Sequence, residues 1–207
     1  MKSKIIIAFS ILFLALVSII IFLAAGDYDF FSRNSSNIDI RPNGYIRIEI
    51  PHDSLIELNS KSLNLPFSFA HSSEGNWIDK SELGWGDIFY PFCNGRIQIT
   101  YKKIQNNLST LINDAHNMTF KHSIVADGIN QSLYIDSDRN INGILFSLRG
   151  NAASRVQFFA TDSLNHFLRG SAYVYAQPNP DSLKPIDAFL EGEILNIMNS
   201  LKWVVAK

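Results

Sequence analysis

The stretch that most constrains the fold is residues 143–176, where apolar and polar residues alternate and two short breaks interrupt the pattern. Alternation with a period of two places successive side chains on opposite faces of a strand. Breaks rich in Gly, Asn, Asp and Ser are typical of tight turns. The stretch therefore predicts three antiparallel strands with one face on a core, at 144–149, 156–161 and 166–175.

Two other stretches have apolar residues at helical spacing, at 104–121 and 182–201. Asn106 or Asn107 is suited to cap the first helix, and Asp181 or Ser182 the second. Gly192 inside the second helix costs about 1 kcal/mol relative to alanine, so this helix is expected to depend on packing. Shorter strands are expected at 45–50, 67–71, 76–79, 87–90, 96–101 and 133–136. The predicted fold class is α+β, a mainly antiparallel β-sheet flanked by two principal helices.

An uncharged apolar segment, residues 5–25, precedes this domain. As a helix it would span about 30 Å, the hydrocarbon thickness of a bilayer. Lys2 and Lys4 precede it, so the positive-inside rule predicts an inner-membrane protein with a single N-terminal span and its domain in the periplasm. The alternative is export after signal cleavage, since Ala24-Ala25-Gly26 provides small residues for a cleavage site.

The chain therefore divides into three expected parts. Residues 1–26 form a transmembrane anchor or signal segment, and residues 27–41 are a polar tether without sustained periodicity. Residues 42–207 form a single α+β envelope domain.

Few classes of chemistry fit the remaining residues. The net charge of −1 gives no basic field to attract nucleic acid. A single cysteine, Cys93, excludes an internal disulfide framework and a multi-cysteine zinc site. Its apolar neighbours favour a buried thiol over a reactive one. The sequence has no Gly-x-Ser-x-Gly elbow, no phosphate-binding glycine loop and no closely spaced histidine pair, so no cofactor and no metal are predicted.

Polar side chains gather around the two turns of the 143–176 stretch. They form either an anion- or partner-recognition surface, or a set of turn-stabilising bonds and cross-strand ion pairs. Two tryptophans in a glycine-rich region are suited to a partner surface if exposed, and otherwise cover the edge of the core. The candidate binding residues are Arg149, Asn151, Arg155, His166, Arg169, Trp77 and Trp85.

Several short motifs resemble a known family. They begin with Pro42-Asn43-Gly44-Tyr45 and continue with Pro66-Phe67-Ser68-Phe69, Thr100-Tyr101-Lys102 and residues 121–127, KHSIVAD. The strongest is Gly150-Asn151-x-Ala153-Ser154-x-Val156-Gln157-Phe158-Phe159-x-Thr161-Asp162-Ser163, followed by His166-Phe167-Leu168-Arg169-Gly170-Ser171. By these motifs, residues 42–203 resemble the gliding motility protein family GldD.

The resemblance implies an envelope component of gliding bacteria that secrete through the type IX system, working with other envelope proteins. It implies no reaction and supplies no catalytic residues. Members of the family are typically lipoproteins with an acylated cysteine after Leu-Ala-Gly-like residues. Here Asp27 follows Leu23-Ala24-Ala25-Gly26. Membrane attachment is therefore expected to depend on residues 5–25.

The leading hypothesis is a membrane-tethered, non-enzymatic interaction protein of the gliding and secretion machinery. An alternative is a periplasmic carrier or sensor that holds a lipid or peptide between sheet and helix, which a deep apolar cavity beneath the last helix would support. A third hypothesis, a hydrolase, needs converging titratable groups, and Asp162 with His166 is the nearest such pair.

Overall fold

The computed structural model describes residues 50, 54–80, 82–121, 126–150, 152, 154–175 and 180–204. The chain separates into two units, residues 1–45 and 46–207, and every described residue belongs to the second. The expected span at 5–25, the tether at 27–41 and the strand at 45–50, apart from Ile50, lie outside the described residues. Among the helices that the structure describes, none has the length and apolar character that crossing a membrane requires.

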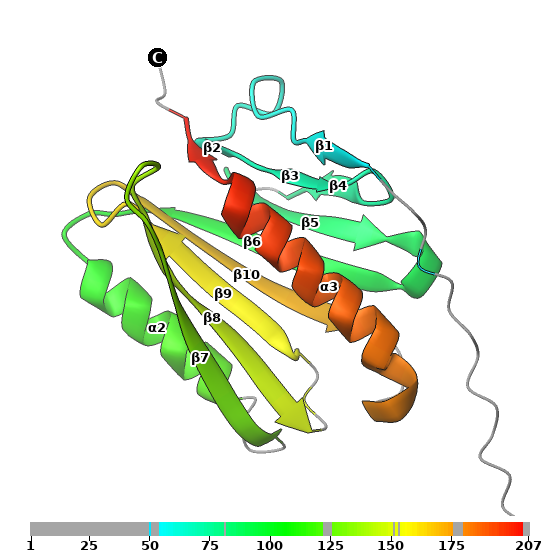
Figure 1. Ribbon diagram of the computed structural model, residues 1–207. Helices are drawn as coiled ribbons and strands as arrows, with labels where there is room; N and C mark the ends of the chain where they lie inside the picture. The colour runs from blue at the N-terminus through cyan, green and yellow to red at the C-terminus, as the bar shows by residue number, and fades with distance from the viewer. Residues whose placement is uncertain are drawn as a thin grey trace, which may run out of the picture. The chain divides into compact units, whose positions relative to one another are not determined.

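A seven-stranded antiparallel sheet forms the centre of the described unit (Figure 1). Three of its neighbouring strands are the predicted ones of the 143–176 stretch, since β8 pairs with β9 and β9 with β10. Across the sheet the order is β4 (Asn76–Asp79), β5 (Trp85–Tyr90), β6 (Gly95–Lys103), β10 (His166–Val174), β9 (Val156–Thr161), β8 (Ile141–Gly150) and β7 (Ala126–Asp136).

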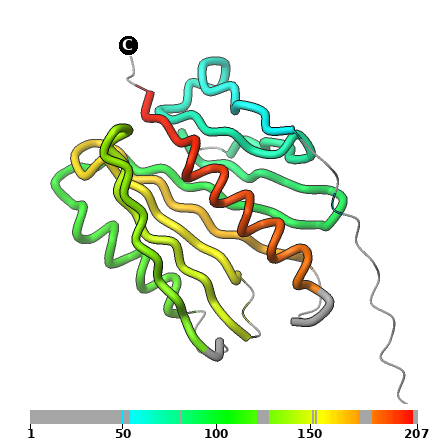
Figure 2. Tube along the Cα trace, in the orientation of Figure 1, coloured from blue at the N-terminus to red at the C-terminus, as the bar shows by residue number. Residues whose placement is uncertain are grey.

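Two smaller sheets and one short helix complete the strand layer. β1 (Leu55–Glu57) pairs with β3 (Ala70–Ser72), and the short 3-10 helix η1 (Pro91–Cys93) joins β5 to β6. The chain path in Figure 2 brings the C-terminal strand β11 (Lys202–Trp203) beside β2 (Phe67–Ser68). The C-terminal residues are thereby tied to the first third of the chain.

The helix α3 (Pro180–Ser200) crosses one face of the large sheet (Figure 1). Its side chains at 186, 190, 194, 197 and 198 are buried against Ile97 and Ile99 of β6, Phe158 of β9 and Leu168 of β10. The helical apolar spacing of α3 thus meets the even-numbered residues of β9 and β10. This interface is the larger core of the unit.

The helix α2 (Leu108–Lys121) packs on the other face of the same strands. Ala115 of α2 lies in a smaller core with Phe146, Phe159 and Phe167, and the alternate residues of β9 and β10 therefore face α2. Both faces of the central strands are covered, and all six side chains of β9 are buried. β7 lies at one edge of the sheet and exposes Leu133 and Ile135.

The predicted α+β class with two principal helices is confirmed, and several element bounds need correction. The strand expected at 133–136 is the end of β7, which begins at Ala126. The strand expected at 67–71 is two strands, because β2 pairs with β11 whereas β3 pairs with β1. The helix expected from 104 begins at Leu108. The Ile104 N–H donates to the Asn165 carbonyl, and Asn106 has a left-handed φ of 58°, so the chain is not helical there.

Candidate functional site

One cross-strand row of side chains extends beyond the part of the sheet that α2 covers. Trp85 of β5 pairs with Thr100 of β6, Thr100 pairs with Arg169 of β10, and Arg169 pairs with Phe159 of β9. Paired residues point to the same face of a sheet. Phe159 lies in the core beneath α2, so the row runs from this core out to Trp85.

A groove of about 300 Å³ lies where this row leaves the cover of α2. Apolar side chains form much of its lining, and Lys102, Arg169 and Asp114 contribute charges. Its lining residues are Trp85, Thr100, Lys102, Leu111, Asp114, Ala115, Met118, Phe167 and Arg169.

Arg169 is held in the groove by a buried amide. Its Nη2 donates a hydrogen bond of 2.7 Å to Oε1 of Gln157. The hydroxyls of Thr119, on α2, and Ser171 lie 3.2 and 3.4 Å from the same oxygen. Gln157 is 1% exposed, and its Nε2 has no hydrogen-bond partner among the described residues. The Thr119 hydroxyl also lies 2.9 Å from the Ala115 carbonyl oxygen, so the short bond from Arg169 is the strongest contact to the Gln157 oxygen, and it holds the guanidinium in place.

The positive charge of Arg169 lacks a counter-ion within the described part of the chain, where no carboxylate forms an ion pair with it. Burial lowers the pKa of the guanidinium, while Tyr173 acts in the opposite direction. A desolvated charge is costly unless it is paired. The groove thus contains a fixed cation whose hydrogen-bond partner in the described part of the chain is a neutral amide.

Trp85 and Lys102 form the other wall of the groove. The Nε1 of Trp85 donates to the Tyr101 carbonyl at 3.1 Å, which fixes the indole. The Nζ of Lys102 lies 4.5 Å from the centroid of that ring, a cation–π contact, and 3.8 Å from Oε2 of the exposed Glu82. Two candidate residues predicted from the sequence, Trp85 and Arg169, therefore lie in one groove.

The other arginines around the first turn have different surroundings. Arg155 forms an ion pair of 2.5 Å with Asp187, and both side chains are largely buried, so it ties this turn to α3. Arg149 is exposed on β8. Asn151 lies outside the described residues. Of the candidate residues at this turn, Arg155 forms an ion pair, but with a helix rather than within the turn or across strands.

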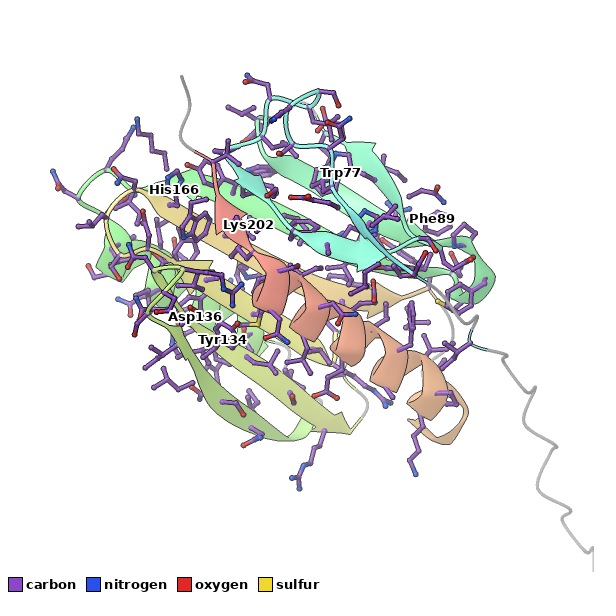
Figure 3. The ribbon with its side chains drawn as sticks, turned by 45° about the horizontal axis from the view of Figure 1, so that its top comes forward. Trp77, Phe89, Tyr134, Asp136, His166 and Lys202 are labelled. Carbon is purple, nitrogen blue, oxygen red and sulfur yellow. The ribbon has the colours of Figure 1, made fainter. Side chains whose placement is uncertain are left out.

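Trp77 covers the edge of the core. It is half-buried on β4, and its ring packs edge-on against Phe69 at 6.4 Å between centroids. A Cβ added at Gly86 would overlap the same ring. Figure 3 labels it near one edge of the sheet, with Tyr134 and Asp136 of β7 at the opposite edge. Its placement agrees with the core-covering interpretation.

His166 and Asp162 engage separate partners. The Nδ1 of His166 lies 2.9 Å from the Tyr101 hydroxyl, and its ring stacks on Trp203 at 5.0 Å. Oδ1 of Asp162 accepts the N–H groups of Leu164, Asn165 and His166, so the carboxylate closes the turn. Desolvation, the largest single effect, acts to raise the pKa of the Asp162 carboxyl. The three hydrogen bonds and the electrostatic effect of His166 together outweigh it, so the pKa is lowered. The pair lacks the hydrogen bond between carboxylate and imidazole that would orient a general base.

The single cysteine is buried, as predicted. Cys93 is 8% exposed, and its Sγ lies 3.8 Å from the Tyr90 carbonyl. Desolvation raises the pKa of its thiol, which disfavours the reactive thiolate. Within the described ranges, no three His, Cys, Asp or Glu side chains gather as metal ligands would.

Sequence reasoning did not single out the charged lining residues Lys102 and Asp114, nor Thr119 and Gln157, which form the hydrogen-bond network behind Arg169. Gln157 offered a signal, because it is a polar residue near the start of a strand whose next three residues, Phe158, Phe159 and Ala160, are apolar. Buried polar groups in such strands need partners, so a glutamine there indicates a polar network. The other three depend on the packing of α2, which spacing alone does not fix.

Comparison with curated protein sequences gives no match. Residues 35–203, most of the chain and nearly all of the described unit, match the family model for the gliding motility lipoprotein GldD. This match includes every residue of the groove. The chain therefore belongs to the GldD family of gliding motility lipoproteins.

Proposed function

We propose that the protein is a membrane-tethered, non-enzymatic component of the gliding motility and type IX secretion machinery. It acts through contacts with other envelope proteins of that machinery. Membership of a gliding motility lipoprotein family supports the envelope location and the role in motility. The secretion system, the partners and the absence of a reaction are parts of the proposal.

The groove at Arg169 is the observation that best supports a role through contacts. A fixed cation beside an aromatic ring and aliphatic side chains is a common composition for an interface hot spot. The titratable groups that a hydrolase would use, Asp162 and His166, are engaged in the turn and in ring stacking instead.

We also propose that residues 5–25 hold the protein in the inner membrane, with residues 27–41 as a tether and residues 42–207 as the periplasmic domain. The uncharged segment and the preceding lysines support this topology. Asp27 rather than a cysteine follows Leu23-Ala24-Ala25-Gly26, so the proposal assigns membrane attachment to the apolar segment. Carbonate extraction of membranes tests it, because an integral span stays in the pellet and a cleaved, exported domain is released.

The carrier hypothesis gains less support from the geometry. It needs space beneath α3, where Ile194, Ile197 and Met198 are fully buried against the sheet. The groove at α2 is at the small end of the range for ligand sites, about 300–1,000 Å³.

Gene deletion tests the proposed role. We expect a strain lacking the protein to lose colony spreading and the secretion of surface proteins, and to regain both when the full chain is supplied. Normal spreading in the deletion strain would contradict the role in motility, and normal secretion would separate the protein from the type IX system.

A further inference from the structure

We propose that the groove between α2 and strands β5, β6 and β10 binds an acidic side chain of a partner protein, presented beside an apolar residue on an extended segment. This inference rests on the proposed function, because it assumes that the protein acts by contact. It assigns the chemistry of the contact: an aspartate or glutamate carboxylate for Arg169, and an aliphatic or aromatic neighbour for the apolar wall.

The charges of the groove favour one carboxylate. Its lining contains two cations, Arg169 and Lys102, and one acid, Asp114, so its net charge is +1. Lys102 also has a long, exposed contact with Glu82, of the kind that contributes little. A single carboxylate would neutralise the groove, whereas a phosphate of charge near −2 would leave it with a net charge of −1.

The donors are held ready for an incoming group. A guanidinium has five N–H donors in a planar fork that matches a carboxylate. Within the described chain, Arg169 makes one hydrogen bond, from Nη2 to Gln157. Because Thr119 and Ser171 also contact that amide oxygen, the fork is oriented before a ligand arrives. Preorganisation of this kind reduces the entropy that binding costs.

The apolar part of the lining explains why the carboxylate should come with a hydrophobic neighbour. Leu111, Met118 and Phe167 lie beside Arg169 in the lining, and Trp85 stands at the outer end of the row. Met118 is 46% exposed, and its flexible thioether can adapt to a partner's side chain. A volume of about 300 Å³ holds one or two side chains. These features fit a peptide segment better than a free metabolite.

Selection from a random heptapeptide library on the purified full chain in detergent tests this assignment. We expect the bound peptides to be enriched in Asp or Glu next to Leu, Ile, Phe or Met. In the best peptide, replacing the acid by its amide should weaken binding about tenfold to a hundredfold, the range for hydrogen bonds to charged groups. On the Arg169→Gln variant the same replacement should have little effect, because its partner is absent.

Matched variants separate binding at the groove from a general effect of the protein's net charge. Lys61→Gln removes one positive charge from an exposed loop and should leave the acidic enrichment unchanged. If circular dichroism shows that Arg169→Gln does not fold, Lys102→Gln gives a second test at the groove. This variant should weaken binding of the acidic peptide but not of the peptide in which the acid is replaced by its amide. 4-Phenylbutanoate, a free carboxylate with an apolar body, tests whether the groove prefers a peptide segment to a small molecule with the same groups.

Several results would overturn the assignment. These are peptides without acidic enrichment, no peptides selected above the empty matrix, equal selection by wild type and Arg169→Gln, or 4-phenylbutanoate binding as tightly as the best peptide. The deletion phenotype is independent of these outcomes. A deletion strain that stops gliding while the library shows no acidic preference refutes the groove assignment alone. A strain that glides while the preference holds refutes the proposed function alone.

Discussion

Tyr90 of β5 donates a hydrogen bond of 2.6 Å to Oε2 of Glu193 on α3, and this bond lies inside the larger core. The same oxygen accepts the Ser72 N–H at 2.8 Å, and Oε1 accepts the amide of Asn196 at 3.0 Å. A buried carboxylate thereby joins α3 to β3 and β5. Sequence reasoning did not foresee it, because Glu193 interrupts the apolar stripe of the helix.

Removing the Tyr90 hydroxyl tests the strength of this link. We expect Tyr90→Phe to lower the free energy of unfolding by about 1.5–3 kcal/mol, because a buried carboxylate loses a donor. Urea denaturation of the purified protein measures the change. Tyr175→Phe, at an exposed position, should change it by less than about 0.5 kcal/mol. Equal effects of the two substitutions would show that the bond contributes nothing specific.

Arg139 closes the C-terminal end of α3. Its Nη1 donates to the carbonyls of Met198, Asn199 and Leu201 at 3.2, 2.6 and 3.2 Å, and its Nη2 pairs with Asp136 at 2.6 Å. The last carbonyls of a helix have no partner within it, so this side chain satisfies them. We expect Arg139→Ala to lower the free energy of unfolding by about 1.5–3 kcal/mol. Arg139→Lys should recover only part of the loss, because it keeps the charge without the fork.

Replacing Gly170 and replacing Gly192 with alanine should change the stability of the protein in opposite directions. A Cβ at Gly170 would overlap the buried ring of Phe158, whereas one at Gly192, within α3, meets nothing within 4 Å. We expect Gly170→Ala to destabilise the protein by about 1–3 kcal/mol through overpacking. Gly192→Ala should stabilise it by about 0.5–1 kcal/mol through helix propensity. Thermal unfolding checks both, and loss of stability in Gly192→Ala would contradict this account of α3.

Stability should fall as the pH drops from about 7.5 to 5.5. His71 is 3% exposed, and desolvation lowers the pKa of its imidazole, although the Ser72 carbonyl and Glu193 act in the opposite direction. Desolvation lowers the pKa of His166 as well, while Asp162 acts to raise it. Below the unfolded value of about 6.5 the unfolded chain therefore binds more protons than the folded one, so acid favours unfolding.

The thermal midpoint at the two pH values measures this dependence. The His71→Asn substitution should reduce the difference between the two thermal midpoints, and its amide can replace the donor Nδ1. The Asp187 carboxyl has the opposite effect on stability at lower pH. Desolvation raises its pKa, although Arg155 acts to lower it, so protonation of this carboxyl favours the folded state. A midpoint that is unchanged, or higher at the acidic pH, would contradict the assignment to the histidines.

The local patterns of the sequence were sufficient for the central strands and both helices. Val156, Phe158 and Ala160 alternate with Gln157, Phe159 and Thr161, and this alternation places the two sets on the faces covered by α3 and α2. The pattern failed for β7 because Gly128, Asn130 and Ser132 are poor strand formers. Pairing with β8 holds that segment extended, and pairing is a tertiary contact that propensity does not contain.

The candidate site was only partly predictable for a similar reason. Arg155 precedes one apolar strand and Arg169 lies within the next, and the sequence pattern gives neither arginine an evident partner. One meets Asp187, 32 positions away, and the other meets the neutral Gln157 in a groove. Which arginine retains an uncompensated charge depends on where α2 and α3 lie across the sheet. Residue type and spacing therefore identified Arg169 as a candidate without separating it from Arg155.

Photo-cross-linking in living cells from residue 117, beside the groove on α2, tests the central claim most directly. With benzoylphenylalanine in place of Asn117, we expect ultraviolet light to join the protein to another envelope component of the gliding or secretion machinery, identified by mass spectrometry. This adduct should disappear in the Arg169→Gln variant and persist in Lys61→Gln at equal protein level. An adduct that Arg169→Gln leaves unchanged, or no adduct at all from properly localised protein, would contradict the claim that this groove is the contact through which the protein acts.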